Sequence, residues 1–254
     1  AYIYTINNDH NWDYQAKLTS DNEENDFFGS DVSISGDYAV IGAPEVDDAS
    51  NNGGAAYIFK RSGSTWSQQA KMITSEASFN DYFGKSVSIS LDRVLIGMYS
   101  DDVGGNESGS AHVYKRDGTN WSLEKIFYAS DADANDFFGY SVAIDSSYII
   151  IGTPSSEASG IPENAGSISM YRYSPDLYEI TSLEHDDYEG EYNSLIQVDD
   201  NTYALAYHRG SVGYISTFTI PADGSSITEV KTLEHDDSEG RYNSLIQVDD
   251  NTYA

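Results

Sequence analysis

The chain alternates short segments in which every second residue is apolar with more continuous apolar runs. After Phe28-Gly29, residues 32–35 alternate, a Gly-Asp turn follows, and residues 38–42 are almost wholly apolar. A period of two indicates a half-buried strand, whereas a short apolar run between turns indicates a strand covered on both faces. The two segments therefore predict a β-hairpin.

The same pattern returns along the chain. Asn-Asp-Phe-Phe-Gly at residues 25–29 recurs at residues 80–84, with Tyr in the third place, and at residues 135–139, a spacing of 55 residues each time. Each copy precedes a hairpin, a loop rich in Gly, Asp and Asn, a third strand and a fourth strand that begins at an aromatic residue. Each unit is thus predicted to be a four-stranded meander.

The last third keeps this layout with a different consensus. Residues 183–204 and 233–254 match at 20 of 22 positions, which indicates a recent duplication. No segment of useful length has the period of a helix. Four-stranded units in series are typical of a β-propeller, because one blade cannot bury both of its faces alone.

We predict an all-β fold, a single β-propeller domain of four-stranded antiparallel blades. The chain begins with segments that align with the third and fourth strands of a unit, and its last segment aligns with the first two. A fifth, composite blade would join these ends and hide their sheet edges. The alternative is a fragment of a longer array. The predicted blades are residues 21–75, 76–130, 131–183, 184–233, and 234–254 with 1–20.

Phe28-Gly29 followed by Gly42-Ala43-Pro44 resembles the FG-GAP repeat of integrin α-chain propellers and of many secreted bacterial and archaeal proteins. The resemblance covers about residues 1–182; unit two has Gly97-Met98-Tyr99 and unit three has Gly152-Thr153-Pro154 in the second half of the motif. It implies an extracellular or cell-surface scaffold for recognition or adhesion rather than an enzyme. Many FG-GAP blades carry a calcium loop between their first two strands, but here that turn is too short to surround Ca²⁺.

Charge narrows the classes of partner. The 254 residues include 42 Asp and Glu against 13 Lys and Arg, for a formal net charge of −29. Such a chain repels phosphate backbones and anionic lipids, which argues against nucleic acid and membrane surfaces and favours cations or basic surfaces. No apolar run approaches the roughly 18 residues of a membrane span. We expect a protein or glycan ligand, and a module that is monomeric or part of a longer multidomain chain.

The predicted propeller separates this charge between its two ends. Loops between strands two and three and between blades share one end and carry more than half of the acidic residues. Basic residues concentrate in the hairpin turns at the opposite end: Lys60, Arg61, Arg93, Lys115, Arg116 and Arg172. The acidic end predicts either bound cations or a surface adapted to salt.

Two acidic segments are candidates for weak calcium capture, because their alternate oxygens could converge on one ion. Their ligands would be Asp131, Asp133, Asn135 and Asp136 in one segment, and Asp21 and Glu23 in the other. Neither matches a full calcium-loop motif. A structural interpretation is also open, since an Asn-Asp pair before Phe-Gly commonly closes a turn by accepting backbone N–H bonds.

Candidate ligand-binding residues are those that break the repeat near the acidic end: Lys85, Met98, Tyr99, His208 and Arg209. Trp12, Trp66 and Trp121 recur at equivalent positions, where they would stack on sugars or, as we prefer, pack between blades. The five His form no metal motif and no Gly-x-Ser-x-Gly elbow occurs, so no hydrolase is specified. Alternatives to a recognition scaffold are a multivalent lectin, a subunit of an extracellular fibre or surface layer, and an enzyme with axial carboxylates.

Overall fold

The computed structural model describes residues 1–20, 26–156 and 166–172 in full, and beyond them the main chain of the strands. Its strands are β1 (Tyr2–Ile6), β2 (Trp12–Lys17), β3 (Val32–Ser35), β4 (Tyr38–Ala43), β5 (Ala55–Ser62), β6 (Thr65–Met72), β7 (Val87–Ser90), β8 (Arg93–Met98), β9 (Ser110–Asp117), β10 (Asn120–Phe127), β11 (Ser141–Ile144), β12 (Tyr148–Thr153), β13 (Ser167–Arg172), β14 (Tyr178–Glu184), β15 (Gly190–Asp199), β16 (Thr202–Arg209), β17 (Val212–Thr219), β18 (Thr228–His235), β19 (Gln247–Asp249) and β20 (Thr252–Tyr253).

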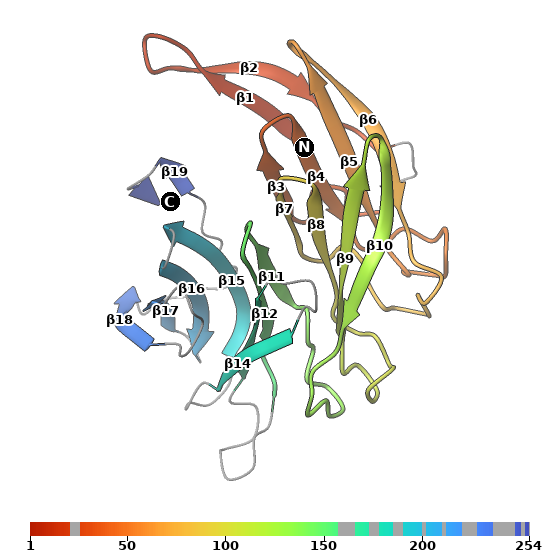
Figure 1. Cartoon of the computed structure of the whole chain (residues 1–254), viewed down its shortest axis with the longest axis vertical. Helices are drawn as coiled ribbons and strands as arrows, with labels where there is room; N and C mark the ends of the chain where they lie inside the picture. The colour runs from red at the N-terminus through yellow and green to blue at the C-terminus, as the bar shows by residue number, and fades with distance from the viewer. Residues whose placement is uncertain are drawn as a thin grey trace.

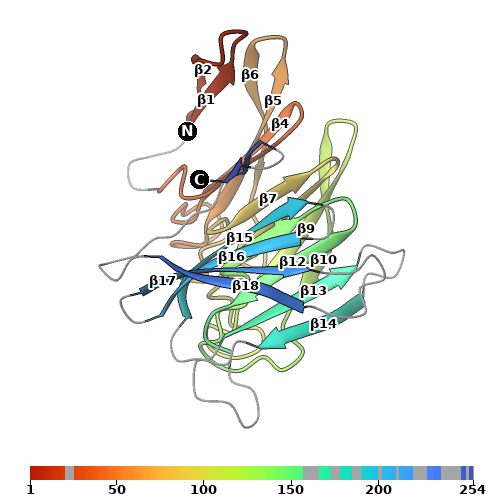
Figure 2. The ribbon, with the colours of Figure 1, turned by 90° about the vertical axis from the view of Figure 1, so that its left-hand side faces the viewer.

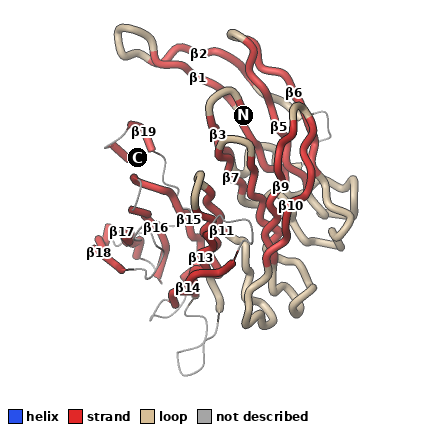
Figure 3. Tube along the Cα trace, viewed as in Figure 1, coloured by secondary structure: helices blue, strands red, loops and turns tan. Residues whose placement is uncertain are grey.

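The strands form antiparallel sheets of consecutive strands, as the repeat predicts. Four sheets have four strands each: blade 1 (β3–β6), blade 2 (β7–β10), blade 3 (β11–β14) and blade 4 (β15–β18). In Figure 1 the first strands of these blades lie toward the middle, whereas β6, β10 and β18 lie at the periphery. Strand and loop account for everything described (Figure 3), and no described segment is a helix long and apolar enough to cross a membrane.

The two halves of the predicted composite blade are separate two-stranded sheets. β1 pairs with β2 and β19 pairs with β20, and the described strands show no pairing between the two sheets. Figures 1 and 2 both draw β19–β20 toward the end of the molecule that carries β1–β2. The all-β propeller architecture is confirmed, while the composite fifth blade and the blade boundaries stay predictions.

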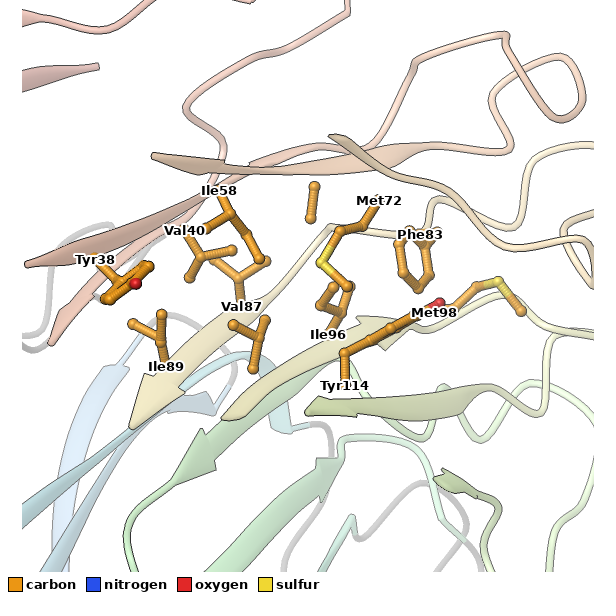
Figure 4. Packing of buried hydrophobic residues seen from close by; sticks show 12 residues of the cluster. Tyr38, Val40, Ile58, Met72, Phe83, Val87, Ile89, Ile96, Met98 and Tyr114 are labelled. Atoms are coloured by element: carbon orange, nitrogen blue, oxygen red, sulfur yellow. The ribbon is translucent and has the colours of Figure 1, made fainter. Parts of the chain in front are cut away.

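The core lies between neighbouring sheets because each second strand alternates its side chains between two faces. Tyr38 and Val40 of blade 1 point toward blade 2, where they meet Val87, Ile89 and Ile96 (Figure 4). Their neighbours Ala39 and Ile41 instead pack with Ile3 of β1, Ala16 of β2 and Leu18, which follows β2. A third cluster joins Leu95 and Val113 of blade 2 to Val142 and Ile149 of blade 3. Both faces of these sheets are thus covered, which explains the continuous apolar runs.

The polar residues at the first strands form hydrogen bonds between blades, in addition to the apolar packing. Asp31 Oδ2 accepts a hydrogen bond from the Val87 N–H at 2.7 Å, and Ser33 Oγ accepts one from Ile89 at 3.2 Å. Ser88 Oγ repeats the contact one blade further on, accepting from the Ile144 N–H at 3.1 Å. Side-chain oxygens on one first strand therefore bond the backbone of the next, which explains why these strands alternate.

Candidate functional site at the loop face

The loops that carry the Phe-Gly motif, called here FG loops, are hydrogen-bonded to the preceding blade. The N–H groups of Asn80, Tyr82 and Phe83 donate to the carbonyl oxygens of Asn51, Asn52 and Gly53 at 3.0, 3.1 and 3.0 Å. The next junction repeats the pattern, with Asn135, Phe137 and Phe138 donating to residues 106–108. FG loops and strand-two-to-three loops therefore lie at one end of the described blades, which we call the loop face.

Two glycines of the motif meet where neighbouring blades touch. The Gly84 N–H donates to the Gly97 carbonyl of its own blade at 3.0 Å. The Gly84 carbonyl oxygen lies against Gly42 of blade 1, where an added Cβ would lie only 2.0 Å from it. Gly97 and the Gly139 carbonyl repeat this contact at 2.0 Å. The two halves of the motif are thus a backbone contact between blades that a side chain would block.

The aromatic residue before each Phe-Gly has an unusual backbone conformation. Phe27, Tyr82 and Phe137 adopt φ values of 52°, 57° and 61°, a region that costs a bulky residue roughly 1–3 kcal/mol. The following residues Phe83 and Phe138 are fully buried, whereas Tyr82 and Phe137 are half-exposed and Phe27 is exposed. In blades 2 and 3 this conformation turns the second aromatic ring of the motif into the core and leaves the first ring at the loop face.

Four rings and one ammonium group meet at the junction of blades 2 and 3; they form what we call the Tyr99 cluster. Tyr99 stacks on Tyr82 with centroids 5.5 Å apart, and contacts Tyr140 at 5.3 Å and Phe137 at 5.8 Å. Lys85 Nζ lies 5.9 Å from the centroid of the Tyr140 ring. All five side chains are half-exposed, so the cluster is a preformed surface of rings.

The structure separates the predicted ligand-binding residues. Lys85 and Tyr99 are brought together in the Tyr99 cluster. Met98 is fully buried in the core between blades 1 and 2, because the β8 alternation turns it away from the surface. His208 and Arg209 are the last two residues of β16 and pair with β17, so they lie in a strand rather than in a loop. Their side chains lie outside the described residues.

One of the calcium candidates, Asp136, has a structural role. The Asp136 carboxylate is buried, and its Oδ2 accepts the Asp133 N–H at 2.7 Å. Asp81, one repeat earlier, accepts the Ser78 N–H at 2.6 Å in the same way. Asp131, Asp133 and Asn135 are exposed. Within the fully described ranges, no group of three His, Cys, Asp or Glu side chains is arranged to hold a metal. The turn-closing interpretation is confirmed at Asp81 and Asp136; Asp21 and Glu23 lie outside the described residues.

Blade 2 contains a buried polar network that sequence reasoning missed. Asp101, Ser110 and His112 replace Val46, Ala55 and Tyr57 of blade 1, as the register of both blades shows. Ser110 Oγ lies 3.1 Å from His112 Nε2, and Asp101 Oδ1 accepts the Val103 N–H at 3.0 Å. Aligning the units at every position, rather than at motifs alone, would have revealed the three substitutions together.

Burial controls the protonation of this network. Desolvation lowers the pKa of His112 to about 4, so its ring is neutral near pH 7. Desolvation also raises the pKa of Asp101, and it raises the pKa of nearby Asp81 to about 6 with help from the charges of Asp101 and Asp102. In the described structure, Asp81 Oδ1 and His112 Nδ1 have no hydrogen-bond partner. The network therefore places polar groups in the core, where the loss of their hydration costs free energy.

The tryptophans support the packing interpretation rather than a sugar platform. Trp66 Nε1 donates to Gln15 Oε1 at 2.7 Å, and Trp121 Nε1 donates to Gln69 Oε1 at 3.0 Å, each acceptor being on the preceding sheet. Both rings also pack against the clusters between sheets. Trp12 is 62% exposed, because no described segment covers its face of β1–β2.

Three arginines at the opposite end make contacts within the chain. Arg61 pairs with Asp37 at 2.7 Å, and Arg93 pairs with Glu124 at 2.9 Å. The Arg116 guanidinium lies over the rings of Tyr38 and Trp121, at 4.4 and 5.8 Å from their centroids. These contacts join strands and blades, so this end of the described blades is a poorer candidate for binding than the loop face.

The fold and the junctions between blades define a propeller built from FG-type repeats. The chain belongs to the FG-GAP repeat family, which matches residues 12–59, 66–114 and 121–171, more than half of its length. Each match begins in the last strand of one sheet and ends in the third strand of the next. Each matched repeat therefore spans the junction between two sheets, where the glycines and buried Phe residues lie.

Solved structures share the architecture at low sequence identity. A protein from Lactobacillus plantarum has a TM-score of 0.58 at 13% identity, over 91% of this chain and 62% of that one. A putative 6-phosphogluconolactonase from Bacteroides uniformis has 0.57 at 13% identity, over 91% and 63%. Sqt1 of Saccharomyces cerevisiae has 0.50 at 10% identity, over 84% and 49%. These likenesses show the fold alone, and the chain spans about half to less than two thirds of each protein. Curated protein sequences gave no match.

Proposed function

We propose that this chain is a non-enzymatic recognition module, at the cell surface or outside the cell, that binds a protein or glycan ligand through its loop face. The observation that carries the proposal is the Tyr99 cluster. Its rings are held by backbone hydrogen bonds between FG loops and neighbouring blades, so little freedom is lost when they bind. Tyrosine offers a large contact area with few rotatable bonds, which suits recognition surfaces.

Charge at the loop face supports the same proposal. Asp47, Asp102, Asp131 and Asp133 are exposed around the described loops, and the chain as a whole carries a formal charge of −29. A face of one sign attracts partners of the opposite sign and speeds their association. At the hairpin ends, by contrast, Arg61 pairs with Asp37 and Arg93 pairs with Glu124.

The test compares variants at the two ends of the molecule. A loop-face variant combines Lys85→Ser and Tyr99→Pro, which introduce the residues that unit one carries at these positions. An opposite-end control combines Leu91→Ser, Lys115→Gln and Asp117→Asn, all exposed positions. Glycan and peptide arrays identify a ligand, and calorimetry measures its affinity. We expect a loss of at least about tenfold for the loop-face variant alone. Equal affinities for all three proteins would contradict the proposal.

A lectin with one site per blade is the second candidate. The repeated display of Phe27, Tyr82 and Phe137 favours it, because equivalent rings at the loop face would create equivalent sites. Stoichiometry separates the two candidates. Several sugar sites per chain would support a lectin, whereas one site abolished by Tyr99→Pro would support a single recognition surface.

A further inference from the structure

Tyr99 and Tyr140 distinguish the junction of blades 2 and 3 from the junction of blades 1 and 2. At the equivalent positions the earlier junction carries Pro44 and Lys85, and Pro44 is buried. Of these two junctions, only the one between blades 2 and 3 therefore gathers four rings. This is a local change on a repeated framework, as expected where a repeat protein gains a site.

The rings of the Tyr99 cluster present their faces in more than one direction. Tyr82 is nearly parallel to Tyr99, with 10° between the ring planes, whereas Phe137 and Tyr140 are inclined to Tyr99 by 55° and 70°. All four rings are half-exposed, so they do not cover one another completely. The face of an aromatic ring is electron-rich and attracts the weakly positive C–H groups of a ligand.

Hydroxyl groups and one ammonium group accompany these faces. Tyr82, Tyr99 and Tyr140 each carry a phenolic hydroxyl, which both donates and accepts hydrogen bonds, and Lys85 adds N–H donors beside Tyr140. Among the described residues, Lys85 forms no ion pair. Apolar faces with a few polar groups beside them are typical of sites for small ligands.

A pyranose sugar has the complementary surface. One face of its ring carries C–H groups, and its edge carries hydroxyl groups that donate and accept hydrogen bonds. Charge then selects among sugars, because the exposed carboxylates of the loop face and the formal charge of −29 repel carboxylated or sulfated sugars. A neutral sugar is therefore the ligand that suits both the rings and the charge around them.

We propose that the Tyr99 cluster binds one neutral pyranose residue of a glycan. The C–H face of the sugar lies against the rings, and its hydroxyl groups bond to the phenolic groups and to Lys85. This inference rests on the proposed recognition function and names the ligand class. It differs from a lectin with a site in every blade, since Phe27 of blade 1 lies outside the cluster, and it predicts one site per chain.

The experiment titrates the whole chain into fluorescein-labelled pentasaccharides of glucose, N-acetylglucosamine, mannose and galactose, with a pentasaccharide of galacturonate for comparison. Fluorescence anisotropy at low and high salt measures affinity, and calorimetry measures stoichiometry. At least one neutral pentasaccharide should bind, with an affinity that changes less than about twofold between the two salt concentrations. The galacturonate pentasaccharide should bind at least about tenfold more weakly at low salt.

Matched variants separate the cluster from other exposed rings. Tyr99→Pro and Tyr140→Ser introduce the residues of unit one, and each should weaken binding about tenfold because a stacking ring is lost. Tyr140→Phe keeps the ring and should cost only about threefold, through one hydrogen bond. Phe27→Ser and Phe79→Ser remove rings that are 62% and 67% exposed outside the cluster, and should leave the affinity unchanged. Thermal unfolding checks each variant, and Tyr140→Ser still tests the site if Tyr99→Pro does not fold.

Two outcomes would overturn the inference. The first is equal weakening by cluster and control variants, or several sites per chain that Phe27→Ser reduces, because either result would place the sugar outside the Tyr99 cluster. The second is no binding of any neutral pentasaccharide or neutral array glycan while a peptide ligand still requires the loop face. In that case the proposed recognition function stands and the sugar is wrong, whereas the absence of any ligand that requires the loop face would remove both.

Discussion

At the residue scale, the glycines of the FG-GAP motif matter for the contact between blades more than for local conformation. Gly42 has an ordinary backbone, yet an added Cβ would meet the Gly84 carbonyl oxygen at 2.0 Å. Gly36 is the reverse case, with φ of 57° and no atom within 4 Å of the added Cβ. The pair therefore separates steric exclusion from backbone strain, and both effects are measurable in one protein.

Gly42→Ala should lower the free energy of unfolding by about 3 kcal/mol, because two backbones must separate to admit the methyl group. Gly36→Ala should cost about 1 kcal/mol, the price of a left-handed conformation. Urea denaturation monitored by circular dichroism measures both. Similar losses for the two variants would show that the contact between blades yields easily.

The buried carboxyl groups predict an unusual dependence of stability on pH. Burial raises the pKa of Asp31, Asp81 and Asp101, with Asp81 at about 6. A raised pKa in the folded state means that the folded chain binds these protons more tightly than the unfolded chain. The contribution of Asp81 to the free energy of unfolding should therefore rise as pH falls from about 7 toward 4, by on the order of 1 kcal/mol. Buried His112 contributes the opposite change over this range, because its pKa is lowered to about 4 and the unfolded ring binds a proton first. Denaturation midpoints of the unchanged chain and of Asp81→Asn across this range separate the two, and a midpoint difference that does not vary with pH would contradict the prediction.

Asp101→Val restores the residue of blade 1, where Val46 is fully buried. The variant removes a desolvated carboxyl group and a negative charge near Asp81, so we expect about 1 kcal/mol of stabilisation at pH 7.5 and a shallower rise toward acid. Asp117→Asn on the exposed end of β9 is the control for net charge. A destabilised Asp101→Val protein with an unchanged pH profile would mean that the network contributes to stability as it stands.

At the element scale, identical strands have different environments. Val-Ser-Ile-Ser occurs in both β3 and β7. In β3, Val32 and Ile34 are 55% and 58% exposed, whereas their equivalents Val87 and Ile89 in β7 are 4% and 5% exposed. β7 packs against blade 1, but no described strand covers the corresponding face of β3. The local sequence determines the strand and its alternation, while the neighbouring blade determines which side chains are buried.

Ile89→Ala should therefore destabilise the protein by about 2–4 kcal/mol, as expected for a buried aliphatic side chain. Ile34→Ala should cost less than about 1 kcal/mol if β3 remains uncovered. Thermal and urea unfolding measure the difference. A cost at Ile34 equal to that at Ile89 would show that another segment covers β3 in solution.

At the scale of the whole molecule, the open question is how the propeller closes. Tyr2 and Tyr4 of β1 are 59% and 52% exposed, although Tyr57 and Phe59, one repeat later, are buried at 0% and 4%. A blade face rich in tyrosine and left uncovered is an unfavourable surface. The composite blade predicted from the repeat would pair β20 with β1 and hide that sheet edge, and packing of the preceding blade on the completed sheet would cover this face.

Removal of residues 236–254 tests that closure. If these residues complete the blade, the shortened chain should lose about 5 °C or more in melting temperature, and Tyr2 and Tyr4 should become more reactive to tyrosine nitration. Exchange of β1 amide protons should also accelerate. Unchanged melting, nitration and exchange would favour the fragment of a longer array.

The sequence by itself determined the local elements: the strands, their turns, the repeat of 55 residues and the FG-GAP motif follow from period, turn residues and spacing. It also indicated Lys85 and Tyr99, because both break the repeat. Only the tertiary structure decided that Met98 faces the core, that Asp136 closes a turn, and that Asp101, Ser110 and His112 meet. These facts depend on which blade lies beside each strand. Local sequence cannot specify that neighbour, since identical strands are buried in one blade and exposed in another.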